Sequence, residues 1–167
     1  MSGRFGAVDV HYPAGGGAHA ALVVAADPRF ATVVEERTAF VGGVPPYRAG
    51  FFFERELPAL RAVLATTAAV DLLIVDGYVD LDPAGRPGLG AHVHAELRRP
   101  VVGVAKTAFR AATHAVPVVR GSGARPLFVT AAGLSLTEAA ALVTEMAGSH
   151  RIPDALRRVD RLARGAQ

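Results

Sequence analysis

The chain has 167 residues, no cysteine and a formal net charge of +3, with 51% hydrophobic and 20% charged residues. Without cysteine it can form neither disulfide bonds nor thiolate metal sites. No apolar run reaches the roughly 20 residues that a membrane-spanning helix needs, and the N-terminus lacks the apolar segment of a secretory signal. We therefore expect one globular domain over residues 1–167, located in the cytoplasm, with no membrane partner.

The first part of the chain is predicted to form an antiparallel meander of three strands. Residues 5–12 alternate in polarity, residues 18–26 are apolar, and residues 31–44 are rich in β-formers, with turn residues between them. Asp9 stands between two valines in the first of these strands. A buried carboxylate must be paired or must bind a cation, so Asp9 is a candidate site residue.

The central strand is predicted at residues 71–77, a continuous apolar run that ends in Asp76 and Gly77. Such a run indicates a strand buried on both faces, and ligands gather beyond the carboxyl ends of strands of this kind. Taken alone, the Asp-Gly pair is more typical of a simple turn. A helix is predicted to begin near Glu56, ahead of an apolar stripe that starts at Leu57.

The second half of the chain continues the alternation of strands and helices. We expect helices at 91–97, from Ser135 with Glu138 as a capping box to Met146, and from Pro153 onward, and strands at 100–106, 117–120 and 126–130. The strand at 100–106 ends on Lys106, and Gly121 and Ser122 lie in the turn between the last two strands. This order predicts an α/β fold, a mixed sheet of five or more strands with helices on both faces.

Six segments, in order along the chain, resemble motifs of the endonuclease V family, and together they cover nearly the whole sequence. Residues 8–12 resemble "VDVSY", residues 47–58 "YIPGFLAFRELP", residues 76–77 "DG", residues 103–106 "GVAK", residues 121–129 "GSxVRPLFV" and residues 151–160 "RLPEPTRLAD". The resemblance implies a ribonuclease-H-like fold and a deoxyinosine-specific nuclease. Such an enzyme nicks DNA one nucleotide 3′ of the deaminated base, and RNA stays open as a second substrate.

The same resemblance assigns roles to individual residues. It implies that Asp9, Glu56, Asp76 and Asp160 are acids of a metal site and that Lys106 is the catalytic lysine. Oxygen ligands favour Mg²⁺, with Mn²⁺ as the alternative. The residues it assigns to substrate binding are Tyr47, as the aromatic wedge that separates the strands, together with Gly50, Gly77, Phe109, Gly121 and Ser122. Glu54 competes with Glu56 for the glutamate role, and the motif alignment favours Glu56.

Two segments depart from the family pattern. Arg48 and Ala49 replace an apolar residue and a proline of the wedge, and Asp82 stands where the family has a functional histidine. The sequence therefore leaves two alternatives open: a non-catalytic nucleic-acid-binding relative, or a nuclease of the same fold with another substrate, such as branched or single-stranded DNA. Retention of the four acids and Lys106 favours an active enzyme. The oligomeric state, the number of metal ions and the role of the C-terminal arginines as phosphate contacts or a solvated face also stay open.

Overall fold

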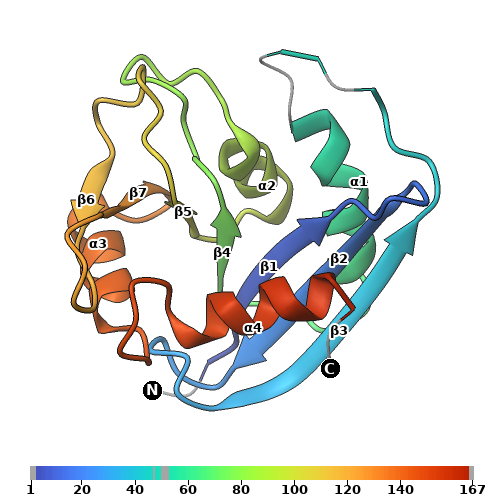
Figure 1. Cartoon of the computed structure of the whole chain (residues 1–167), viewed down its shortest axis with the longest axis horizontal. Helices are drawn as coiled ribbons and strands as arrows, with labels where there is room; N and C mark the ends of the chain where they lie inside the picture. The colour runs from blue at the N-terminus through green and yellow to red at the C-terminus, as the bar shows by residue number, and fades with distance from the viewer. Residues whose placement is uncertain (1–2, 47, 50–52, 166–167) are drawn as a thin grey trace.

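In the computed structural model, residues 3–46, 48–49 and 53–165 are described, so the predicted wedge residues Tyr47 and Gly50 lie outside this part of the chain. The core of the fold is a seven-stranded mixed sheet with the strand order β3-β2-β1-β4-β5-β7-β6 (Figure 1). Its strands are β1 (Phe5–His11), β2 (Ala18–Ala25), β3 (Val33–Val41), β4 (Leu72–Asp76), β5 (Val101–Ala105), β6 (Val116–Val118) and β7 (Leu127–Ala132). The predicted meander and the central buried strand are thereby confirmed.

The direction of the strands determines which of their ends lie together. Strands β1, β4 and β5 run parallel to one another, whereas β2, β3, β6 and β7 join through antiparallel pairings. The carboxyl ends of the three central strands therefore meet at one edge, which lies uppermost in Figure 1. Residues that follow these strands are brought together there, as is usual for ligand sites in sheets of this kind.

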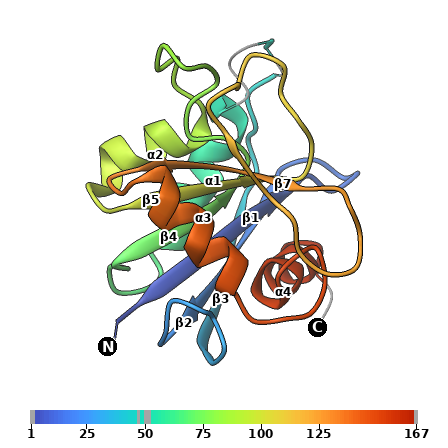
Figure 2. The ribbon, with the colours of Figure 1, turned by 90° about the vertical axis from the view of Figure 1, so that its left-hand side faces the viewer.

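Four helices cover the two faces of the sheet: α1 (Phe53–Leu64), α2 (Leu89–Leu97), α3 (Leu136–Glu145) and α4 (Asp154–Ala163). Figure 2 shows α1 and α2 on one face and α3 and α4 on the other. The alternating side chains of β4 serve both layers, because Ile74 packs into the α3–α4 core and Leu73 and Val75 into the α1–α2 core. Among the described residues, no helix is long and apolar enough to cross a membrane.

Two element boundaries differ from the sequence-based prediction. Helix α1 begins at Phe53, ahead of the predicted start near Glu56, because the charged residues Glu54 and Arg55 stand in its first turn before the apolar stripe. Strand β6 ends at Val118, although the prediction extended it to Arg120. Arg120 leaves the strand because its buried guanidinium donates hydrogen bonds to the carbonyls of Val143 and Met146, at the C-terminal end of α3.

The turn after Asp76 is built into the sheet by two glycines and one buried hydroxyl. Gly77 has a φ of +120°, which a side chain would strain, and its N–H donates to the Val104 carbonyl at 3.0 Å. A Cβ on Gly103 would lie 2.5 Å from the Gly77 carbonyl oxygen. The Thr130 hydroxyl, 1% exposed as a residue, accepts a hydrogen bond of 2.8 Å from the Val79 N–H. These contacts fix the backbone that carries Asp76.

Thr130→Val should lower the free energy of unfolding by about 1–3 kcal/mol, because it keeps the side-chain shape but leaves a buried N–H without an acceptor. Thr144→Val is the matched control, since that hydroxyl lies on the exposed side of α3 and bonds only the Ala140 carbonyl. Urea unfolding of both variants measures the difference. Equal stability of the two variants would show that the Val79 N–H finds another acceptor.

Candidate active site

The register of two neighbouring strands brings Asp9 and Asp76 together. Strand β1 pairs in parallel with β4, with Val8 opposite Val75, so the two acids follow as the next residues of each strand. Both belong to the carboxyl edge of the sheet. The prediction that these strands are neighbours is confirmed. Their pairing places the two acids at adjacent positions.

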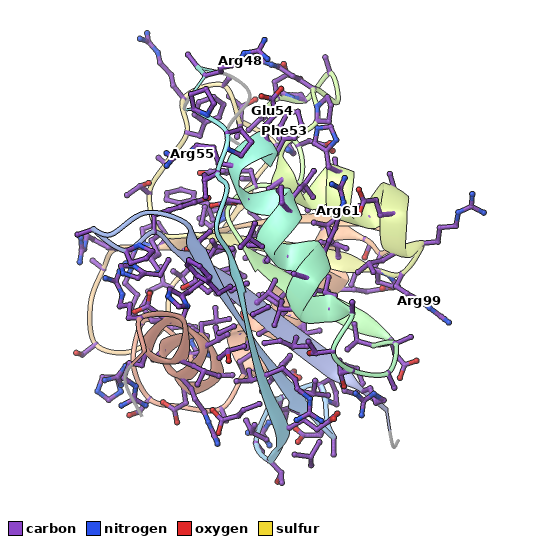
Figure 3. The ribbon with its side chains drawn as sticks, turned by 90° about the vertical axis from the view of Figure 1, so that its right-hand side faces the viewer. Arg48, Phe53, Glu54, Arg55, Arg61 and Arg99 are labelled. Carbon is purple, nitrogen blue, oxygen red and sulfur yellow. The ribbon has the colours of Figure 1, made fainter. Side chains whose placement is uncertain are left out.

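Two further acids reach this edge from helices on opposite faces of the sheet. Glu56 lies in the first turn of α1, and it lines one hollow with Asp9 and Asp76. Asp160 comes from α4, where it interacts with the Asp9 carboxyl and also pairs with Arg164 at 3.2 Å. Glu54 has a different environment, because its carboxylate forms an ion pair with Arg48 at the outer side of α1 (Figure 3). Glu56 is therefore the glutamate that faces the other acids.

Burial and mutual repulsion raise the pKa values of these acids. Burial, followed by the charge of Asp76, raises the pKa of Asp9 to about 7, although the hydrogen bond from the Val10 N–H lowers it. Burial, followed by the charges of Asp76 and Asp9, raises the pKa of Glu56 to about 8, against the lowering effect of Arg55. Carboxyl groups with pKa values this high lie in surroundings that disfavour their charge and favour a cation.

Lys106 supplies the positive charge closest to Asp76. Its ammonium nitrogen lies 3.9 Å from the Asp76 Oδ2, and both side chains remain partly exposed. Burial raises the pKa of Asp76, the Lys106 charge lowers it, and Asp160 raises it. The backbone of Lys106 is held from the α3–α4 connection, because the Arg151 guanidinium donates to the carbonyls of Lys106 and Pro126. Lys106 thus projects from a fixed strand end toward the acids.

The chemistry of the donor set fits a hard divalent cation. The four acids offer only carboxylate oxygens, and burial and then the neighbouring carboxylates raise the pKa values of Asp9 and Glu56, a repulsion that a bound cation would relieve. In the described part of the chain, however, no three His, Asp or Glu side chains are arranged so that they could hold a metal ion as they stand. Like charges repel, and Arg164 and Lys106 draw Asp160 and Asp76 toward themselves. The structure gathers the acids in one neighbourhood, and their role as metal ligands stays a prediction.

A pocket of about 450 Å³ opens beside the acids and shares Glu56 and Asp76 with them. Its other lining residues among those described are Phe53, Gly77, Tyr78, Leu81, Arg86, Gly88, Leu89 and Phe109. The lining is mostly aromatic and aliphatic, as is usual for pockets that bind a small or planar ligand. Gly77 and Phe109, both predicted to bind substrate, lie in this lining.

One side of the pocket is held rigid by Tyr78. The Tyr78 hydroxyl donates to the Thr107 carbonyl at 2.7 Å and accepts from the Phe109 N–H at 2.9 Å. The Tyr78 and Phe109 rings are tilted against each other, with centroids 5.9 Å apart. The segment that follows Lys106 is thereby fastened to the turn that follows Asp76. Sequence reasoning missed Tyr78, because nothing in the sequence shows that these two loops meet.

The loop after Asp76 does not place Asp82 in the pocket. The Asp82 carboxylate accepts from the Arg86 N–H at 3.1 Å, so it serves the turn of its own loop. Asp80 and Pro87 form a β-bridge, and Leu81 donates to the Arg86 carbonyl at 2.7 Å. Arg86 and Leu81, which sequence reasoning also missed, line the pocket instead.

Gly121 and Ser122 do not line this pocket. Gly121 has a φ of +71°, and a Cβ there would lie 3.0 Å from the Arg151 backbone nitrogen. Close packing against the α3–α4 connection thus explains why a glycine stands at position 121. Ser122 is exposed in the same turn, and a contact of these two residues with nucleic acid stays a prediction.

The C-terminal arginines have mixed environments. Arg151 bonds backbone carbonyls, Arg158 pairs with Glu36 at 2.7 Å, and Arg164 pairs with Asp160. Arg157 and Arg161 are exposed on the outer face of α4. These last two are the better candidates for phosphate contacts.

Comparison with known proteins identifies the family and the fold. The family model for endonuclease V matches residues 2–125. An endonuclease V of Streptomyces avermitilis is 33% identical, with 99% of this chain and 81% of the relative covered. A crystal structure of endonuclease V from the same species superposes with a TM-score of 0.83 at 28% identity, covering 98% of this chain and 81% of that chain.

A more distant structure shows the same fold. The endonuclease V of Ciona intestinalis, solved with a 23mer DNA containing an inosine followed by a ribo-adenosine, superposes with a TM-score of 0.82 at 20% identity. The match covers 99% of this chain and 85% of that chain. The predicted ribonuclease-H-like α/β architecture is thereby confirmed. Because the family model matches well over half of the sequence and a relative above 30% identity aligns over almost all of it, this chain belongs to the endonuclease V family.

Proposed function

We propose that the chain is a Mg²⁺-dependent endonuclease that nicks DNA near deaminated bases, chiefly inosine, in nucleic-acid repair. The observation that carries this proposal is that Asp9, Glu56 and Asp76 line one hollow at the sheet edge, where Glu56 and Asp76 also line a largely apolar pocket. Membership of the endonuclease V family supports it, as does the inosine-containing DNA bound by the Ciona intestinalis relative.

The residues that would hold the cation are Asp9, Glu56 and Asp76, with Asp160 at the edge of the group. A bound Mg²⁺, or Mn²⁺ as the alternative, supplies neutralisation of phosphate charge and an activated water. The raised pKa values of Asp9 and Glu56 mean that these carboxyls must lose protons before they bind it. The Lys106 ammonium, beside Asp76, adds a positive charge where the scissile phosphate would lie.

The pocket beside the acids is proposed to take the deaminated base after it leaves the stack. Extrusion costs less for a mispaired base, which favours a lesion over an ordinary pair. Phe109 and Tyr78 offer aromatic faces for the base. Tyr47 stays proposed as the wedge that fills the gap, on the family motif alone, because it lies outside the described residues.

A nuclease of the same fold with another substrate is the second candidate, and the loop from Tyr78 to Arg86 favours it. That loop carries Asp82 where the family has a histidine, and Asp82 binds its own turn. Incubation with Mg²⁺ and duplexes that carry one inosine, uracil, abasic site or mismatch separates the candidates. Preferred cleavage of the inosine duplex supports the proposed function, whereas preferred cleavage of branched or single-stranded DNA supports the alternative.

Asp76→Asn and Glu56→Gln should each lower cleavage of the inosine duplex by about 100-fold or more, because each removes a negative charge that holds the cation. Glu54→Gln is the matched control, since Glu54 pairs with Arg48 in an exposed position and should leave cleavage near the unmodified rate. Single-turnover cleavage assays measure all three variants. Loss of cleavage in Glu54→Gln together with retention in Glu56→Gln would reverse the assignment of the glutamate.

Stability of the cation-free protein should fall as the pH rises from about 4 to about 8. In the folded state the pKa of Glu56 is raised to about 8 and that of Asp9 to about 7, against the ordinary values of 4.5 and 3.8 for these side chains in the unfolded chain. In this window the folded state holds protons that the unfolded chain has already released, so raising the pH favours unfolding. Mg²⁺ should therefore raise the melting temperature more at pH 8.5 than at pH 5.5.

Scanning calorimetry with and without Mg²⁺ measures this dependence. Glu56→Gln should flatten the pH dependence and reduce the Mg²⁺ effect, because its amide carries no titrating proton. Glu145→Gln, at an exposed position near the end of α3, should behave like the unmodified protein. A Mg²⁺ effect that is equal at both pH values would contradict protonated acids at the cation site.

A further inference from the structure

Arg86 is the one basic side chain among the described residues that line the pocket. The rest of the lining consists of aromatic and aliphatic groups, two glycines, and the two acids shared with the candidate metal site. Within the described residues, no acid pairs with the Arg86 guanidinium, and the hydrogen bonds of Arg86 are made by its backbone. Arg86 is an exposed residue, so its five N–H donors are open to solvent and to a ligand in the pocket.

The backbone of Arg86 is held in place. Its N–H donates to the Asp82 carboxylate, its carbonyl accepts from Leu81, and the bridge between Asp80 and Pro87 closes the loop on both sides. The guanidinium on this held backbone is planar and presents its N–H donors as a rigid fork that can bond two acceptors at once.

The pocket also restrains the plane of a bound base. Tyr78 fastens Phe109 through two hydrogen bonds at its hydroxyl, so the aromatic wall cannot shift independently of the turn after Asp76. A base stacked on this wall would present its edges, where hydrogen-bonding atoms lie, to the lining residues. Specificity then depends on which donors stand at the edge.

An arginine fork matches one edge of a purine in particular. Two parallel N–H donors fit the two acceptors O6 and N7, which hypoxanthine carries, and adenine replaces O6 with an N6 donor. Deamination of adenine to hypoxanthine changes this donor to an acceptor. The fork therefore distinguishes the lesion from the base that gave rise to it, although it accepts guanine equally well.

We infer that Arg86 is a specificity-determining residue that reads the O6 and N7 edge of an extruded 6-oxopurine in this pocket. The inference rests on the proposed function, and it adds the edge of the base that is recognised. The preference against adenine arises at Arg86, whereas the preference against guanine arises from the stability of the G·C pair that must open.

The test compares the affinity of the protein for two duplexes that differ by one atom group. Fluorescence anisotropy measures the affinity, and a chelator removes divalent cations so that no cleavage occurs. One duplex carries hypoxanthine and the other 7-deazahypoxanthine, in which a C–H replaces N7. The unmodified protein should bind the hypoxanthine duplex about 10-fold more tightly, the value of one charged hydrogen bond. In Arg86→Met this ratio should fall to about one, because the acceptor no longer has a partner.

Two further variants separate shape from charge. Arg86→Lys keeps the charge and loses the fork, so its ratio should also fall toward one while overall affinity stays closer to that of the unmodified protein. Arg99→Met removes the same charge at the start of the connection to β5, where the side chain projects away from the body of the molecule (Figure 3), and should keep the 10-fold ratio.

The outcomes distinguish this inference from the proposed function. If Arg86→Met weakened both duplexes by the same factor and kept the ratio, Arg86 would be a phosphate contact and the inference would be overturned. A ratio of one in the unmodified protein would overturn it as well. Failure of the unmodified protein to prefer inosine over undamaged duplex, in binding and in Mg²⁺-dependent cleavage, would instead reject the proposed function.

Discussion

The burial of neighbouring carboxylates, together with their mutual repulsion, at the carboxyl ends of two parallel strands is the constraint on which the site depends. Pairing of β1 with β4 places Asp9 beside Asp76, and helices from opposite faces add Glu56 and Asp160. Burial disfavours the charges of Asp9, Glu56 and Asp76, and the Lys106 ammonium beside Asp76 counters it at that one carboxylate. The unfavourable free energy of these buried carboxylates is confined to one edge of an otherwise well-packed sheet. An arrangement of this kind is typical of a site that acts through a divalent cation.

The acids and the pocket form one functional unit because they share residues and supports. Glu56 and Asp76 line the pocket, and Gly77 continues from the acid directly into its wall. Tyr78 then connects this turn to the segment after Lys106. A base in the pocket and a phosphate beside Lys106 would thus be positioned by the same pair of loops. Under the proposed function, recognition and cleavage would be coupled through the backbone of these two loops rather than through separate domains.

The sequence predicted those features that depend on local pattern. Apolar runs and turn residues identified the strands, and the family motifs singled out the acids and Lys106, which the fold brings to one edge of the sheet and whose roles stay a prediction. Features set by contacts between distant segments were not predictable. The predicted start of α1 was wrong because the charged residues Glu54 and Arg55 precede the apolar stripe in its first turn. Arg86 and Tyr78 were missed because their roles depend on a loop whose form differs from the family motif. Gly121, assigned to substrate, has a packing reason that only the neighbouring Arg151 backbone reveals.

The central claim is that Asp9, Glu56 and Asp76 jointly hold a divalent cation, and the position of that cation tests it most directly. Crystals grown with Mn²⁺ at pH 8.5, above the raised pKa values of about 7 and 8, provide anomalous scattering from the metal alone. The account predicts a peak between these three side chains, with carboxylate oxygens about 2.0–2.2 Å away after small rotations of the side chains. A peak elsewhere, or none among these acids at millimolar Mn²⁺, would contradict it.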